Sequence, residues 1–485
     1  MDLKKTISGI AGPLAFIIIQ GVEFEGLSPE GRAIMASTAW VAIWWIFETL
    51  PMAVTALLPI VLFPLTGGMD IKTTTTTYFS PLVVLYLGGF IIALAIEKWE
   101  LHQRIALNII KVIGSNTKMI VLGFMVATAF LSMWISNTAT TLMMLPIGMA
   151  IANQLGKLRH ADDEELRMNF NKSLVLAIAY AASIGGMATL IGTPTNAIFS
   201  AISIELYDKE VSFSEWFSFG LPVSTFLLFI AWLYLTSFSF KSGSSKIYGA
   251  TDEVDKRLKM LGKMGYEEKL IAIVFGLTAL AWMLRSFVLS KFIPNLNDTI
   301  IAIAGAIVLF IIPSKEKGQA LMDWETAKKL PWGVLLLFGG GLAIAASFKN
   351  SGLADWFALQ MAALESYHYA IVLLAIILMV NFFTEITSNV ATAAVVLPIL
   401  ASMSQSIDVH PFGLMIGACF AASCAFMLPV ATPPNAIVYS SGYLKVGDMI
   451  RTGVWLNILT AIILFLCIYF LLPLIWGIDM MKFPF

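Results

Sequence analysis

Charge is scarce in this sequence. Only 13% of its 485 residues are Asp, Glu, Lys or Arg, whereas 58% are hydrophobic and the mean hydropathy is +0.84. Soluble domains carry about 25% charged residues, so this composition excludes an ordinary soluble protein. Because hydrophobic runs recur along the whole length, they predict a bundle of membrane-spanning helices rather than one anchor on a soluble domain. The net charge of −1 gives no reason to expect a nucleic-acid partner.

Residues of enzymatic chemistry are also few. The sequence has no GxxxxGK[ST] motif, so ATP-driven transport is not supported. No paired catalytic His, Asp and Ser residues and no metal-ligand spacing occur at membrane depth, which argues against an enzyme. We expect the cysteines to be buried as small apolar side chains and the histidines to be solvated in loops or at span ends: Cys419, Cys424, Cys467, His102, His160, His368 and His410.

Two hydrophobic blocks, 119–155 and 369–404, are too long for one simple span. The motif Ser136-Asn137-Thr138 interrupts the first block, and Ser388-Asn389-Val390 interrupts the second. We therefore predict two re-entrant hairpins, each of which enters and leaves the membrane on one side.

The fold class expected is an all-α polytopic membrane protein with about eleven transmembrane helices. Two spans are predicted to be broken helices, at Gly192-Thr193-Pro194 and at Ala431-Thr432-Pro433. The remaining segments are spans at 7–22, 31–50, 53–68, 78–99, 213–240, 269–290, 298–313, 332–352 and 450–475, broken spans at 172–206 and 412–441, amphipathic stretches at 101–116 and 353–366, and a charged loop at 241–268.

Loop charge predicts the orientation. If the N-terminus is cytoplasmic and both long blocks are hairpins, most of the 30 basic residues fall in inside loops, as Lys and Arg do in membrane proteins. The C-terminus is then outside. Treating 119–155 as a full crossing would invert every later loop. We expect an integral protein of the plasma membrane.

The second half of the chain repeats the first. Leu131–Ile147 (LSMWISNTATTLMMLPI) aligns with Phe383–Ile399 (FTEITSNVATAAVVLPI), and Gly192–Ile198 (GTPTNAI) aligns with Ala431–Ile437 (ATPPNAI). Equivalent spans are separated by an odd number of crossings, so the two halves have opposite orientation. Inverted repeats with broken helices are typical of secondary transporters with a binding site near the bilayer midplane.

The repeated motifs suit an anion without any Lys or Arg. Ser, Asn and Thr are good N-caps, and proline is favoured at the first helical position. The four motifs therefore predict four helix N-termini that converge at one depth, where their N–H groups and positive dipole ends favour negative charge. The carbonyls freed at the same breaks, with Ser and Asn side-chain oxygens, suit a small hard cation.

Some of these polar residues could serve helix packing instead of ligand binding. Single Ser, Asn and Thr side chains also hold membrane helices together by hydrogen bonds. The pairs Ser132/Ser136 and Thr384/Ser388 place two hydroxyls on one helix face before each tip, for packing or for cation ligation. Glu385, an acidic residue at membrane depth, is a candidate for local hydrogen bonding or for cation or proton coupling.

These motifs resemble the divalent anion/sodium symporter family, also called INDY-like or sodium/dicarboxylate transporters, over residues 30–475. The resemblance implies a homodimer whose protomers have a scaffold and an elevator-type transport domain. On this division, 1–118 is mainly scaffold, 119–240 the first half of the transport domain, 241–268 a cytoplasmic loop, 269–352 scaffold spans, 353–368 an amphipathic connecting helix, and 369–475 the second half of the transport domain.

The resemblance also implies site residues. The first sodium site would use Ser132, Ser136, Asn137 and Gly192, and the second would use Thr384, Ser388, Asn389 and Ala431. Substrate would meet Asn137, Thr138, Thr193, Pro194, Asn389, Val390, Thr432 and Pro433. Val390 stands where many members have threonine, so one hydroxyl worth about 1 kcal/mol is lost.

The implied function is secondary active transport of C4–C5 dicarboxylates such as succinate, malate, fumarate or 2-oxoglutarate. Sodium ions are the candidate coupling ions, and no other cofactor is expected. Sodium-independent dicarboxylate exchange is the nearest alternative, and an anion channel is a more distant one. The sequence alone leaves the preferred carboxylate and the coupling mode open.

Overall fold

The structure is a computed structural model that describes residues 3–113, 116–155, 164–241, 250–315 and 318–485. Within these ranges it is helical apart from one isolated bridge between Pro313 and Ala320, which confirms the all-α class. Six helices in the described residues are long and apolar enough to cross a membrane, and the shorter apolar helices include Thr117–Ser132 and Tyr369–Phe383, the first arms of the two hairpins. The number of crossings, about eleven, stays a prediction.

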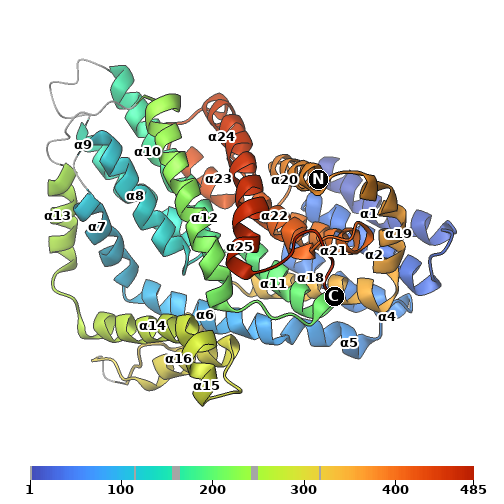
Figure 1. Ribbon diagram of the computed structural model, residues 1–485. Coiled ribbons are helices and arrows are strands. Elements are labelled where there is room, and N and C mark those ends of the chain that lie inside the picture. Colours follow the sequence, from blue (N-terminus) through green and yellow to red (C-terminus); the bar gives the residue numbers. More distant parts are fainter. Residues whose placement is uncertain (1–2, 114–115, 156–163, 242–249, 316–317) are drawn as a thin grey trace.

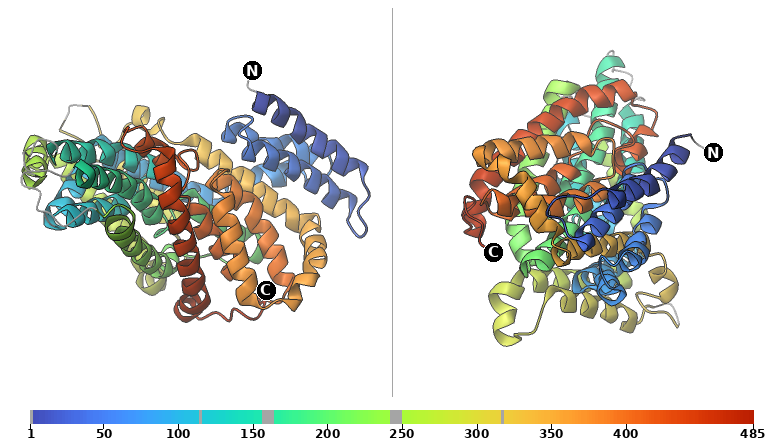
Figure 2. Two further views of the ribbon diagram at one scale, coloured as in Figure 1. Left: turned by 90° about the horizontal axis from the view of Figure 1, so that it is seen from above. Right: turned by 90° about the vertical axis from the view of Figure 1, so that its right-hand side faces the viewer.

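The N-terminal helices lie at the right-hand end of the molecule in Figure 1, and the two further views in Figure 2 show α1 and α2 packed side by side there. From there α6 runs beneath the centre of the bundle toward α7 at the left. The helices are α1 Leu3–Gly21, α2 Pro29–Ile46, α3 Met52–Thr55, α4 Leu58–Leu65, α5 Ile71–Thr76, α6 Pro81–Lys98 and α7 Leu101–Ile113.

The first repeat follows as a helical hairpin, a broken helix and a long helix that ends in a π-helical turn, η2. In Figure 1, α8, α9, α10 and α12 occupy the left half, and α11 lies near the centre. They are α8 Thr117–Ser132, α9 Asn137–Leu155, α10 Glu164–Gly186, α11 Pro194–Tyr207, α12 Phe213–Leu233 and η2 Tyr234–Ser239.

The second half has the same order of elements. Figure 1 places α14 to α16 below the bundle and α24 across its centre. The elements are α13 Ala250–Leu261, α14 Tyr266–Leu284, η3 Arg285–Leu289, α15 Ser290–Phe292, α16 Asp298–Ile311, α17 Trp324–Ala327, α18 Trp332–Asn350, α19 Leu353–Met361, η4 Ala362–Ser366, α20 Tyr369–Phe383, α21 Asn389–Ser406, α22 Pro411–Ser423, α23 Pro433–Tyr439, α24 Val446–Leu466, η5 Cys467–Leu471 and α25 Leu472–Trp476.

The charged segment 241–268 is not a simple loop, which corrects the sequence-based assignment. It contains α13, which packs against α7 and α9, and the first residues of α14. Val254 of α13 is buried, and Asp255 forms an ion pair with Lys111 at 2.6 Å. Hydropathy did not indicate this helix, because its sequence is rich in charged residues.

Two histidines expected to be solvated are buried instead. Within the described residues, His102 and His410 are 8% and 4% exposed. His102 Nδ1 lies 3.1 Å from the Ile96 carbonyl oxygen, and His410 Nδ1 accepts from the Phe412 N–H at 3.2 Å. Both rings therefore pair with main-chain groups at the ends of helices. His160 lies outside the described residues.

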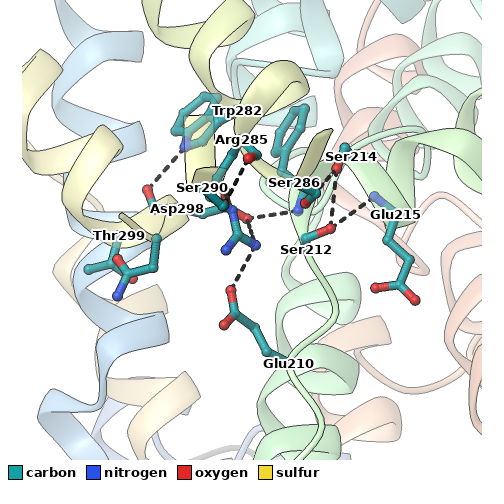
Figure 3. Close-up of polar contacts among 12 residues, drawn as sticks. Glu210, Ser212, Ser214, Glu215, Trp282, Arg285, Ser286, Ser290, Asp298 and Thr299 are labelled. Carbon is teal, nitrogen blue, oxygen red and sulfur yellow. Dashed lines mark hydrogen bonds and ion pairs between the residues drawn. The ribbon is translucent and has the colours of Figure 1, made fainter. Parts of the chain in front are cut away.

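A buried ion-pair cluster joins η3 and the start of α16 to the loop between α11 and α12 (Figure 3). Arg285 Nε lies 2.6 Å from Asp298 Oδ1, and the two side chains are 11% and 5% exposed. Glu210 adds a contact of 2.9 Å to Arg285, and the Phe213 N–H donates to Asp298 Oδ2 at 2.8 Å. Buried charges require such partners, so the cluster fixes where α12 starts.

Replacing Arg285 with methionine is expected to destabilise the fold by about 3 kcal/mol, because Asp298 would be left as an unpaired buried charge. Thermal unfolding of the purified protein measures the loss. The double variant Arg285→Met/Asp298→Asn should recover part of it. Lys328→Met, in an exposed pair with Glu325, is the matched control and should change little. Equal effects for Arg285→Met and Lys328→Met would contradict this account.

Candidate functional site

Each long hydrophobic block is two helices joined at its Ser-Asn motif, as the sequence predicted. In the first, α8 ends at Ser132 and α9 begins at Asn137. In the second, α20 ends at Phe383 and α21 begins at Asn389. The arms of each hairpin pack against the first half of the broken helix that follows, so each tip faces a helix break.

Three oxygen atoms gather at the first hairpin tip. Ser132 Oγ lies 2.6 Å from Asn137 Oδ1 and 2.7 Å from the Ala182 carbonyl oxygen of α10. A hydroxyl carries one proton, so it donates to only one of these two acceptors. Hydroxyl, amide and main-chain oxygens at a helix break are the ligands that sodium takes in transporters with broken helices. The group therefore fits one small cation.

The second tip repeats this arrangement. Thr384 Oγ1 lies 2.7 Å from Asn389 Oδ1 and 3.1 Å from the Ala422 carbonyl oxygen of α22. Ser132 and Thr384 are both fully buried within the described structure. The same three kinds of oxygen occupy equivalent positions in both halves, as the inverted repeat requires if each half holds one ion.

Glycine makes the close approach at the first tip possible. A Cβ on Gly186 would stand 2.7 Å from Asn137 Oδ1 and 3.0 Å from the Gly192 carbonyl oxygen. A Cβ on Gly192 would collide with the Gly186 carbonyl. These glycines let the ends of the α10–α11 break approach each other beside the Asn137 side chain. The role of the Gly192 carbonyl as a cation ligand stays a prediction.

If the oxygen group at the first tip binds sodium and drives transport, Gly186→Ala should weaken the sodium dependence about tenfold, because overpacking costs about 1–3 kcal/mol and here displaces Asn137. Sodium titration of solute uptake in proteoliposomes measures the change. Gly276→Ala is the matched control, since a Cβ there meets nothing within 4 Å. An unchanged sodium titration for Gly186→Ala would show that Asn137 does not need this space.

One asparagine ties together each helix break. Asn196 Nδ2 donates to the Thr189 carbonyl at 2.7 Å and approaches the Gly186 carbonyl at 3.2 Å. Its repeat partner, Asn435 Nδ2, donates to the Ala425 and Leu428 carbonyls, both at 3.0 Å. These bonds satisfy carbonyls freed where the helices stop, which is a condition for irregular backbone at membrane depth.

The two breaks meet in the middle of the structure. Thr195 Oγ1, after the first break, lies 2.8 Å from Ser423 Oγ, before the second. Tyr180 OH donates to the Phe426 carbonyl at 2.7 Å. In addition, α11 packs against α21 of the other hairpin, and α23 packs against α9. Each half therefore supplies a half-helix to the hairpin of the other half.

The predicted helix starts are confirmed, but most of the motif side chains do not cap them. Ser136 Oγ accepts from the Ala139 N–H at 3.3 Å. By contrast Ser388, Thr193 and Thr432 precede their helices without a side-chain cap bond. Uncapped first-turn N–H groups can serve an anion. The convergence of all four starts at one depth stays a prediction, and α23, with seven residues, contributes only a short dipole.

The candidate residues differ in their exposure to solvent. The hydroxyls of Ser132 and Thr384 are fully buried, whereas the hairpin-tip residues that follow them are half-buried or exposed. Thr193, Gly192, Thr432 and Ala431 are buried; Asn137, Thr138, Pro194, Ser388, Asn389 and Val390 are half-buried; Ser136 and Pro433 are exposed. A solute thus reaches the amides before the inner hydroxyls.

Glu385 supports the second break. Its Oε1 accepts from the Phe426 and Met427 N–H groups at 2.7 and 2.9 Å, and its Oε2 accepts from the Leu428 N–H at 3.0 Å. The Asn457 amide of α24 donates a further bond of 2.7 Å to Oε1. The local hydrogen-bonding role considered from the sequence is therefore present. The carboxylate accepts the main-chain N–H bonds that a continuing helix would otherwise satisfy. Through Asn457 it also connects the break to α24.

Sequence reasoning missed the carbonyl ligand candidates of Ala182 and Ala422. Every residue type has a main-chain carbonyl, so the sequence cannot show which carbonyl faces the tip. Only the packing of the helices identifies these two. It also missed Thr195 and Ser423, which join the breaks. The repeated motif GTPTNAI did contain Thr195, but its repeat partner, Pro434, gave no sign of a shared hydroxyl role.

Helical hairpins, broken helices and paired oxygen groups in an apolar bundle define the class: an integral membrane transporter of the inverted-repeat type. A family model described as the sodium:sulfate symporter transmembrane region matches residues 11–477. The chain belongs to this family, in agreement with the resemblance drawn from its motifs.

Curated relatives agree with this assignment. The chain is 44% identical over 484 residues to the sodium-dependent dicarboxylate transporter SdcS of Staphylococcus saprophyticus, covering 99% of this chain and 93% of the relative. It is 45% identical over 476 residues to SdcS of Staphylococcus aureus strain MRSA252, covering 97% and 92%.

Two solved transporters share the fold at low sequence identity. The Alcanivorax borkumensis YdaH transporter matches with a TM-score of 0.60 at 14% identity, covering 91% of this chain and 98% of that one. The Neisseria gonorrhoeae pump MtrF matches with a TM-score of 0.57 at 13% identity, covering 96% and 94%. These likenesses concern the fold alone.

Proposed function

We propose that this chain is a secondary transporter that couples sodium entry to the uptake of C4–C5 dicarboxylates such as succinate, malate, fumarate or 2-oxoglutarate. The observation that carries the proposal is the duplicated oxygen group at Ser132–Asn137 and Thr384–Asn389. The relatives named above are sodium-dependent dicarboxylate transporters, which supports the same ion and the same substrate class.

Each proposed sodium site combines an inner hydroxyl with a tip amide and a carbonyl of the facing break. The first uses Ser132, Ser136, Asn137 and Gly192, with the Ala182 carbonyl added; the second uses Thr384, Ser388, Asn389 and Ala431, with the Ala422 carbonyl added. The substrate carboxylates meet Asn137, Thr138, Thr193, Pro194, Asn389, Val390, Thr432 and Pro433. Sodium placed beside the amides offsets the charge of the dianion.

The movement we propose is of the elevator type. The hairpin of each half packs with a half-helix of the other half, which supports one mobile body containing α8 to α12 and α20 to α24. The remaining spans would form the scaffold and, by analogy with the family, the contact of a homodimer. The proposed orientation, which the distribution of basic loops favours, has the N-terminus in the cytoplasm and the C-terminus outside a plasma membrane.

Uptake of a panel of labelled anions into proteoliposomes tests this function. We expect saturable, sodium-stimulated uptake of C4–C5 dicarboxylates and little uptake of monocarboxylates or sulfate. Counterflow of equal rate with and without sodium would instead identify a sodium-independent exchanger. A non-saturating, ohmic current would identify a channel.

A further inference from the structure

A cavity with a volume of about 620 Å³ lies away from the hairpin tips, between the start of α10, the η2 turn and the start of α24. Lys172, Lys241 and Arg451 supply three cations to its lining, and Glu165 and Asp448 supply two carboxylates. The lining therefore has one net positive charge, which a single phosphodiester group would neutralise.

The charges in the cavity are not equally free. Asp448 is engaged by Lys172 at 2.9 Å and by the Lys445 N–H at 3.0 Å. Within the described part of the chain, neither Lys241 nor Arg451 belongs to an ion pair, and both are exposed. Two cations thus face the opening without a protein anion bound to them.

The frame of the cavity is held by hydrogen bonds between η2 and α24. Tyr234 OH donates to the Thr452 carbonyl at 3.1 Å, and Ser239 Oγ lies 2.8 Å from Thr452 Oγ1. These bonds cross between two long helices beside the cavity. The cavity is therefore part of the folded bundle and not a gap between independent surface side chains.

The cavity opens at the depth of lipid headgroups. It lies at the end of two apolar helices of 27 and 31 residues, Phe213–Ser239 and Val446–Trp476. Helices of this length exceed a hydrocarbon core of about 30 Å, so their ends reach the headgroup layer. Phe238 and Trp455 in the lining are 73% and 61% exposed, and aromatic residues are enriched at this interface.

An apolar stripe continues from the cavity along α24. Ile462, Leu466 and Phe470 follow Trp455 on the helix and are 46%, 45% and 64% exposed. A ligand with a phosphate head and acyl tails would place its head among the cations and its tails along this stripe. Basic pockets between membrane helices bind anionic headgroups in this manner.

We propose that this cavity, framed by Arg451 and Lys241, binds the phosphodiester headgroup of an anionic phospholipid. The predicted topology places it at the cytoplasmic leaflet, where anionic lipids concentrate. The lipid would join the start of α24 to the ends of α10 and η2. Because α24 also holds Glu385 through Asn457, the bound lipid would brace the helix that supports the second break.

Native mass spectrometry of the full-length protein in detergent tests the proposal, with phosphatidylglycerol and phosphatidylcholine of identical acyl chains added at matched concentrations. We expect preferential binding of phosphatidylglycerol, reduced about tenfold in Lys241→Gln/Arg451→Gln. Lys259→Gln/Lys263→Gln removes two exposed cations from outside the cavity lining and should leave the preference unchanged.

Further arms add inorganic phosphate or glycerol 3-phosphate as competitors. If the site takes a lipid, neither free anion displaces phosphatidylglycerol at matched concentration. Displacement by inorganic phosphate would overturn the lipid assignment in favour of a free-phosphate site. Equal binding of the two lipids, or an equal loss in both double variants, would overturn the proposal altogether.

Discussion

Asn137→Ala is expected to lower sodium-driven dicarboxylate uptake at limiting substrate by about 100-fold, because hydrogen bonds to charged groups are worth about 1.5–3 kcal/mol. Asn137 Oδ1 belongs to the first oxygen group, and the residue is half-buried. On the proposed mechanism, the substitution removes a contact to the cation and one to the carboxylate together. Initial uptake rates in proteoliposomes, measured across sodium and substrate concentrations, separate the two losses.

The second half offers an internal comparison. Asn389→Ala removes the equivalent amide beside Thr384, and we expect a similar rise in the sodium concentration needed for half-maximal uptake. Its effect on substrate affinity should be smaller than that of Asn137→Ala, since Val390 already lacks the hydroxyl that Thr138 provides.

Asn153→Ala is the matched control for both substitutions. It lies on α9, far from the tip, and among the described residues its amide oxygen accepts from Tyr443 OH alone, at 2.9 Å. Its uptake should stay near the parental rate. Parental rates for Asn137→Ala and Asn389→Ala would remove both asparagines from the site.

Glu385→Ala is expected to abolish transport and to destabilise the protein by about 4 kcal/mol, because it leaves three main-chain N–H groups, one buried and two half-buried, without their acceptor. Glu385→Gln should be much milder. A glutamine oxygen in the place of Oε1 keeps the bonds from Phe426, Met427 and Asn457, so only the bond from Leu428 is lost. Thermal unfolding and sodium-driven uptake measure both effects.

This graded pair separates the two roles that the sequence left open for Glu385. If its charge carried the coupling, Gln and Ala would impair sodium stimulation alike, although the Gln variant folds normally. If it supports the break, the Gln variant keeps sodium stimulation with a modest loss of stability. Asn457→Ala serves as a control that removes one bond to the carboxylate and leaves its charge.

Sequence patterns predicted the helix breaks well because breaks need particular residues. Proline at the first helical position and Ser-Asn before a helix restrict the backbone locally, so Pro194, Pro433 and Asn389 begin helices where expected. The internal repeat then related the two halves. These inferences rest on short-range chemistry that one chain displays by itself.

What escaped prediction depends on contacts between distant segments. The carbonyls of Ala182 and Ala422 could not be recognised, since any residue supplies a carbonyl and only helix packing selects which one faces the tip. Glu385 has no equivalent in the first half, where Met133 stands, so the repeat gave no guide to its partners. Likewise α13 is charged and short, and only its packing on α7 and α9 reveals it.

Concentrative uptake of labelled succinate by the purified protein in proteoliposomes tests the central claim most directly. With sodium only outside, we expect succinate to accumulate above its external concentration and to leave again when an ionophore collapses the sodium gradient. Accumulation that is unaffected by the sodium gradient, or uptake that stops at equal concentrations, would contradict sodium-coupled transport by this chain.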